Sequence, residues 1–252
     1  MIVRLRAPEH FSGIGVKRPD FSQSVVAVSA FSSNLLFWWQ SGYFEPAAEL
    51  KPLLHTWSLA VEEQYYLLFP VLLTLALRPG KRWAATVFAG IALISLLAAQ
   101  WGSVVDPTAT FYLLPTRVWE LLIGVLVAFH FSGDNRREPN ILVSQFGGAI
   151  GLLLLAYAVF AFDKETPSPS LYTLLPTIGT ALIILFATPQ TFAGQLLGHK
   201  LFVGVGLISY SAYLWHQPIL AFARHRSLSE PSQFLFGALA LAAFVPAYLS
   251  WK

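Results

Sequence analysis

A histidine and a glutamate lie two helical turns apart at the start of a long apolar segment of the chain. His55 and Glu62 are seven positions apart, and Ser58 falls on the same helical stripe between them. An imidazole and a carboxylate placed this way can take a proton from a hydroxyl group, with the acid orienting the base. The spacing predicts proton-transfer chemistry, with His55 and Glu62 as catalytic candidates and Ser58 as a supporting residue.

Two further polar residues follow directly in the same segment. Glu63 is rotated about 100° from Glu62 around the helix axis, and Gln64 comes next. An acid inside a membrane span is costly, so it calls for a functional explanation. We expect Glu63 to be a catalytic candidate and Gln64 a supporting residue. The structural alternative makes His55 an interfacial ring and pairs Glu62 with a basic group on a neighbouring helix.

A second polar cluster opens another apolar segment. Arg117 and Glu120 are three positions apart, so they can pair along one helix. Arg117 could also neutralise Glu62, or bind an anionic group such as a phosphate or a thioester oxygen. We expect both residues to support the site. The alternative is an ion pair that only makes the two charges tolerable in an apolar setting.

A third cluster lies between residues 208 and 218. Tyr213 and His216 share a helical face at a spacing of three, and Tyr210 is three positions earlier. We expect Tyr210 and His216 to contact the substrate, with His216 as a possible second proton-transfer group. The alternative is that His216 serves the backbone carbonyls freed by Pro218, which cannot donate a hydrogen bond.

The composition indicates what kind of elements position these side chains. The chain has 252 residues, of which 56% are apolar and 12% charged, and its mean hydropathy is +0.60. Soluble domains carry about 25% charged residues. We therefore expect an all-α, polytopic transmembrane helix bundle forming one domain over residues 1–252. The sequence has no cysteine and no metal-ligand spacing, so we expect neither a disulfide nor a bound metal.

Apolar segments of roughly 17–25 residues are long enough to cross a bilayer. About eight such spans are expected: Phe21–Trp39, Trp57–Leu77, Trp83–Trp101, Tyr112–Phe131, Ile141–Phe162, Leu171–Ala187, Phe202–Ala223 and Phe234–Trp251. With a cytoplasmic N-terminus, eleven of the 16 Lys and Arg residues lie inside and four outside. The candidate side chains then fall in the outer half of the membrane. The glycines of Gly147-xxx-Gly151 permit close helix packing.

The three clusters together resemble the membrane acyltransferase family 3, bacterial O-acyltransferases that modify surface polysaccharides. The segment from Leu53 to Pro70 is similar to the family's most recognisable motif. Two further blocks, Thr116–Gly124 and Ile208–Pro218, follow in the family's order. The pairs Ser33-Asn34 and Tyr43-Phe44 precede the first motif, as they do in the family.

The resemblance implies transfer of an acyl group, most simply acetyl, from cytoplasmic acyl-CoA to a sugar hydroxyl. The acceptor would be a cell-surface polysaccharide or a lipid-linked glycan. The protein would be a multi-pass protein of the inner cell membrane, in contact with lipid. Acyl-CoA is then the donor substrate, with no permanently bound cofactor and no nucleic-acid partner.

The sequence also departs from the family pattern. Family members begin with helices that carry an Arg and a His, whereas residues 1–20 contain no apolar span and His10 lies in a polar stretch. We therefore expect a fragment that lacks the leading helices and the extreme C-terminus. Two alternatives remain: an inactive truncated relative, and a polytopic transporter or flippase with an intramembrane charge relay.

Overall fold

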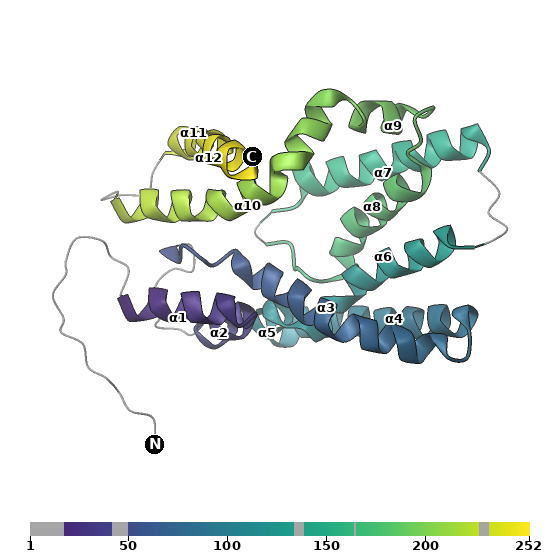
Figure 1. Cartoon of the computed structure of the whole chain (residues 1–252), viewed down its shortest axis with the longest axis horizontal. Coiled ribbons are helices and arrows are strands. Elements are labelled where there is room, and N and C mark those ends of the chain that lie inside the picture. The colour runs from purple at the N-terminus through teal and green to yellow at the C-terminus, as the bar shows by residue number, and fades with distance from the viewer. Residues whose placement is uncertain (1–17, 42–49, 134–138, 164, 227–231) are drawn as a thin grey trace, which may run out of the picture.

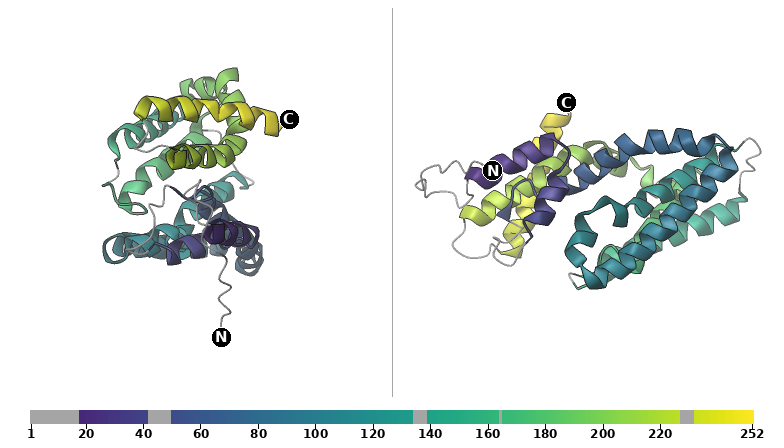
Figure 2. Two further views of the ribbon diagram at one scale, coloured as in Figure 1. Left: turned by 90° about the vertical axis from the view of Figure 1, so that its left-hand side faces the viewer. Right: turned by 90° about the horizontal axis from the view of Figure 1, so that it is seen from below.

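The computed structural model describes residues 18–41, 50–133, 139–163, 165–226 and 232–252, with side chains from residue 21 onward. His10, Tyr43 and Phe44, named above, lie outside these residues. Within the described ranges every regular element is a helix (Figure 1). Helices α1 to α5 gather on one side of the molecule and α9 to α12 on the other (Figures 1 and 2). The predicted all-α class is confirmed.

The expected span Phe21–Trp39 is divided into two short helices, α1 (Arg18–Ser29) and α2 (Ser33–Trp39). Phe31 between them has a φ of 52°, a left-handed conformation that is uncommon for any residue with a side chain. Serines favour this break because their hydroxyls compete for backbone hydrogen bonds. The Ser29 hydroxyl, for example, donates to the Val25 carbonyl at 2.9 Å.

The first half of the chain then forms a long antiparallel pair. Helix α3 (Thr56–Leu77) is followed by α4 (Lys81–Val105), and Gly80 in the turn has a φ of 124° that favours glycine. Helix α5 (Pro107–Tyr112) follows, capped by Asp106, whose carboxylate accepts from the Ala109 N–H at 2.9 Å. A short turn, η2 (Leu114–Thr116), leads into α6 (Val118–Phe131).

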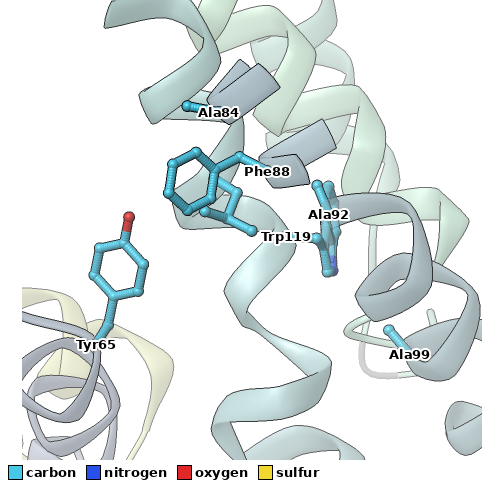
Figure 3. Close-up of a cluster of buried hydrophobic side chains, with 7 residues drawn as sticks. Tyr65, Ala84, Phe88, Ala92, Ala99 and Trp119 are labelled. Atoms are coloured by element: carbon cyan, nitrogen blue, oxygen red, sulfur yellow. The ribbon is translucent and has the colours of Figure 1, made fainter. Parts of the chain in front are cut away.

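The main apolar core lies where α3, α4 and α6 meet. Tyr65 stacks on Phe69, whose ring centroid lies 5.6 Å from that of Phe88. Figure 3 shows Phe88, Ala92 and the buried indole of Trp119 in one cluster. This core fixes α3 relative to α6, and so relates the first polar cluster to the second.

The second half contains a tightly packed helix pair, α7 (Ile141–Ala161) and α8 (Leu174–Phe186). A Cβ added at Gly151 would lie 2.7 Å from the carbonyl oxygen of Gly179, and one at Gly147 would lie 2.5 Å from the Phe186 ring. The close packing predicted for Gly147 and Gly151 is confirmed. A short turn, η3 (Leu171–Thr173), precedes α8, and α9 (Phe192–Leu197), α10 (Lys200–Arg226), α11 (Gln233–Ala242) and α12 (Phe244–Trp251) complete the chain.

Four helical segments of the described chain are long and apolar enough to cross a membrane: Thr56–Leu77, Lys81–Val105, Ile141–Ala161 and Gln233–Trp251. Two apolar helices, Val118–Phe131 and Leu171–Phe186, are shorter. The chain is thus a membrane protein by its helices, while the expected count of about eight spans stays a prediction.

Candidate functional site

The N-terminal end of α3 lies against the middle of α10. Two hydrogen bonds hold α10 to the segment before α3: the Gln217 side chain donates to the Lys51 carbonyl at 3.3 Å, and the His225 ring nitrogen Nε2 lies 2.8 Å from the Leu50 carbonyl oxygen. Residues far apart in sequence are thereby brought together, and the first and third polar clusters form one site.

Three rings form the centre of this site, which we call the ring cluster: His55, Tyr213 and His216. The ring centroids of His55 and Tyr213 are 5.0 Å apart, those of His55 and His216 are 5.4 Å apart, and those of Tyr213 and His216 are 5.5 Å apart. His55 is buried, with 8% of its surface exposed. The two histidines predicted from separate motifs therefore meet.

Hydrogen bonds connect the ring cluster to the backbone. The Tyr213 hydroxyl donates to the His55 carbonyl, and its oxygen lies 2.8 Å from the Ser58 hydroxyl. The Nδ1 atom of His216 lies 2.6 Å from the Tyr213 carbonyl oxygen. Ser58, predicted as a supporting residue, thus reaches the cluster through Tyr213.

Neither ring nitrogen of His55 has a hydrogen-bond partner among the described residues. The Tyr65 hydroxyl and the Trp119 N–H also lack one, but each is a single polar atom on a large apolar ring. A buried polar group without a partner is costly, so an imidazole with two such atoms calls for an explanation. Burial, and to a lesser extent the neighbouring His216, lowers the pKa of His55 to about 4, so the ring is neutral at pH 7.

The two acids that follow on α3 differ in exposure. Glu62 is half-buried and within electrostatic range of the Tyr213 hydroxyl, whereas Glu63 is exposed. Neither forms an ion pair within the described part of the chain. Glu62 makes no hydrogen bond to the ring of His55, so the expected orientation of this base by the acid is not seen in the structure.

Gln64 holds α3 to the break between α1 and α2. Its amide donates to the Phe31 carbonyl and to the Asn34 side-chain oxygen, both at 2.9 Å. Asn34 is fully buried and donates in turn to the Tyr112 carbonyl at 3.1 Å. Gln64 therefore fixes α3, the helix that His55 precedes, and its supporting role at the site stays a prediction.

The Arg117–Glu120 pair predicted along one helix is present, with 3.3 Å between Nη1 and Oε1. Arg117 also donates through Nε to the Phe111 carbonyl at 3.1 Å, and its guanidinium lies 5.1 Å from the centroid of the Trp57 ring. Its ionic partner is therefore Glu120 rather than Glu62. Glu120 also lines a cavity of about 280 Å³ between α6 and α8.

In the third cluster, the sequence predicted Tyr210 as a site residue and did not predict Tyr213. Tyr210 is 61% exposed and is not part of the ring cluster, whereas Tyr213 is at its centre. The signal was present in the sequence, since Tyr213 and His216 share a helical face. No group of His, Cys, Asp or Glu side chains among the described residues could hold a metal ion.

Comparison with known proteins identifies the family to which the chain belongs. The family model of the acyltransferase domain, family 3, matches residues 21–251. The chain belongs to this acyltransferase family. The resemblance expected from the three motifs is thereby confirmed, and the ring cluster lies inside the matched acyltransferase domain.

Three relatives illustrate the match. A protein named "Putative O-acetyltransferase" from Staphylococcus aureus (strain COL) is 29% identical over 79% of this chain and 34% of its own. The peptidoglycan O-acetyltransferase of Listeria monocytogenes is 28% identical over 85% of this chain and 37% of its own. An uncharacterised Haemophilus influenzae protein is 33% identical over 62% of this chain and 66% of its own. No solved structure matches the chain.

The acyltransferase domain described here thus spans about a third of the length of the first two relatives.

Proposed function

We propose that this chain belongs to an integral-membrane O-acyltransferase that moves an acyl group, most simply acetyl, from acyl-CoA to a sugar hydroxyl. The acceptor is a cell-surface polysaccharide or a lipid-linked glycan, and the enzyme is a multi-pass protein of the inner cell membrane with about eight spans. The family match supports the reaction class, and the name of the Listeria relative supports a cell-wall acceptor. The apolar helices support the membrane setting.

The observation that carries the proposal is the meeting of two imidazoles from separate motifs beside an acid. His55 and His216 have their ring centroids 5.4 Å apart, and no described group occupies the ring nitrogens of His55. Buried ring nitrogens without a partner are suited to bind a group that arrives with the substrate. A sugar hydroxyl, which both donates and accepts hydrogen bonds, matches this chemistry.

Acyl transfer then needs a base at the hydroxyl of the acceptor. An imidazole takes the hydroxyl proton while the sugar oxygen attacks the thioester carbonyl, and the tetrahedral intermediate expels the thiolate of CoA, which takes up a proton. Glu62 interacts electrostatically with the Tyr213 hydroxyl, and its charge stabilises the imidazolium formed during the reaction. The exposed Glu63 and Tyr210 can contact substrate at the edge of the site.

The test is acyl transfer from labelled acetyl-CoA to surface glycan, in membranes that contain the full-length protein. The Glu62→Gln variant keeps the shape of the side chain and removes its charge. We expect it to lower the transfer rate by about 10²-fold, at the low end of acid–base effects. Glu165→Gln, in the connector before α8, is the matched control and should retain the wild-type rate.

Two results would contradict the proposal. Full activity in the Glu62→Gln variant would remove that residue from the site. Transport of a glycan across the membrane without any dependence on acyl-CoA would replace the acyltransferase with the transporter considered in the sequence analysis.

A further inference from the structure

The direction of the hydrogen bonds in the ring cluster follows from a count of protons. The Tyr213 hydroxyl has one proton, and the His55 carbonyl can only accept, so that proton lies between them. The second contact of the Tyr213 oxygen, 2.8 Å from the Ser58 hydroxyl, must therefore use the proton of Ser58. Tyr213 is thus fixed by both of its hydrogen-bonding functions.

The same count gives the tautomer of a neutral His216 ring. Its Nδ1 atom lies 2.6 Å from the Tyr213 carbonyl oxygen, which has no proton to give. Nδ1 must therefore carry the hydrogen, and a neutral imidazole carries only one. The other nitrogen, Nε2, is left with a free lone pair, so it is the nitrogen that can accept a proton.

His55 is arranged differently, because no described atom bonds to either of its nitrogens. Its tautomer is therefore free to adapt to whatever binds beside it. Its position, in contrast, is fixed through its carbonyl, which accepts from the Tyr213 hydroxyl. Tyr213 consequently contacts both histidines: it holds the backbone of His55 with its side chain and the ring of His216 with its carbonyl.

We propose that Nε2 of His216 is the atom that takes the proton of the acceptor hydroxyl, and that Tyr213 is the positioning residue that holds His216 and His55 against the same substrate. The inference rests on the proposed function and assigns separate roles within it. His216 is the base, and His55 is the neutral ring that hydrogen-bonds the acceptor. Losing the Tyr213 hydroxyl releases α3 from α10 at this point, and a shift of about 1 Å can cost 10²-fold in rate.

The first experiment measures the tautomer directly. Nitrogen NMR of the full-length protein in detergent, with ¹⁵N-labelled histidine, gives separate signals for protonated and unprotonated ring nitrogens. The His216→Gln variant identifies the His216 signals by their loss. We expect neutral His216 to carry its hydrogen on Nδ1, and a hydrogen on Nε2 would overturn the assignment of the base.

The second experiment separates positioning from folding. The Tyr213→Phe variant keeps the ring and removes the hydroxyl, and Tyr157→Phe, an exposed tyrosine on α7, is the matched control. We expect Tyr213→Phe to lower kcat by about 10- to 100-fold with an unchanged KM for acetyl-CoA. His216→Gln should cost about 10²- to 10⁴-fold. Wild-type kcat per folded molecule in Tyr213→Phe, with only its melting temperature lowered, would reduce Tyr213 to a structural role.

The two experiments also separate this inference from the proposed function. A wild-type protein that shows the expected tautomer but transfers no acyl group contradicts the function, and with it the catalytic role of His216. A protein that transfers acyl groups at the wild-type rate when His216 is replaced by Gln keeps the function and overturns only the inference.

Discussion

The polar groups at the two ends of the first motif are treated differently by the fold. Toward the middle of α3, Gln64 bonds to Phe31 and Asn34, so that its side-chain amide is occupied. At the N-terminal end of the same helix, His55 is more deeply buried than Gln64, yet it has no partner on either ring nitrogen among the described residues. The two side chains, one with hydrogen-bond partners and one without, are only nine positions apart in the sequence.

We infer that this difference distinguishes residues that hold the structure from residues that bind a ligand. A satisfied buried network specifies a rigid arrangement, whereas a buried polar group without a partner costs free energy unless something binds to it. Arg117 belongs with Gln64, since its guanidinium bonds to Glu120 and to the Phe111 carbonyl. We call Gln64, Arg117 and their partners the frame, and we propose that the ring cluster lies outside the frame and binds the substrate.

The largest effect on stability is expected at Arg117. The Arg117→Met variant keeps an apolar side chain against Trp57 but leaves Glu120 without its ionic partner. We expect a loss of about 2–3 kcal/mol in the free energy of unfolding, the upper range for a hydrogen bond to a charged group. Denaturant titration of the purified protein in detergent measures it.

A double variant, Arg117→Met with Glu120→Leu, serves as the control for this prediction. Removing both charges should recover most of the loss, because no unpaired charge is then left behind. Unchanged stability in the single variant would mean that the pair is not part of the frame.

A smaller loss is expected at Gln64. The Gln64→Ala variant removes its two donated hydrogen bonds, to Phe31 and Asn34, and should lower the free energy of unfolding by about 1–2 kcal/mol. The exposed Gln23, with a single contact of 3.4 Å to Gln40, is the matched control, and Gln23→Ala should change little. Equal effects of the two variants would contradict the role assigned to Gln64.

The sequence allowed much of this arrangement to be predicted, because most of it depends on local spacing. Arg117 and Glu120 pair because residues three apart are neighbours on a helix, and Gly151 packs closely because it lacks a side chain. The helical class followed from apolar segments of spanning length. The family followed from three motifs in the right order and is confirmed by the match over residues 21–251.

What the sequence did not reveal depends on contacts between distant segments. The sequence placed Tyr213 on one helical face with His216, but only the approach of α10 to the start of α3 reveals its hydrogen bonds to the His55 carbonyl and to Ser58. The break at Phe31 was likewise missed, because the apolar length of residues 21–39 suggested a continuous span. Gln64 was predicted to support the site, but the partner that gives it this role, Asn34, is thirty residues away.

The difference between Gln64 and His55 is tested most sharply at His55. A variant there should change stability least, and in the opposite direction to the variants of Arg117 and Gln64. The ring nitrogens of His55 have no partner among the described residues, and the His55→Leu variant replaces this imidazole with an apolar side chain, which removes the cost of burying these two polar atoms. We expect the free energy of unfolding at pH 7 to stay equal or rise by about 1 kcal/mol, while acyl transfer falls sharply.

Acidification provides the second measurement. The pKa of His55 is about 4 in the folded chain, against 6.5 for an ordinary histidine, so between these values the unfolded chain binds more protons. The part of the free energy of unfolding that depends on His55 being neutral is therefore fully present above pH 6.5. It is lost as the pH falls toward 4. Tyr213 and His216 lie against this ring. Both of them, and Glu62 near Tyr213, remain in the variant, so the difference between the wild-type and His55→Leu melting curves isolates His55. A variant that is less stable than wild type at pH 7, and equally sensitive to acid, would mean that His55 belongs to the frame and has a partner there.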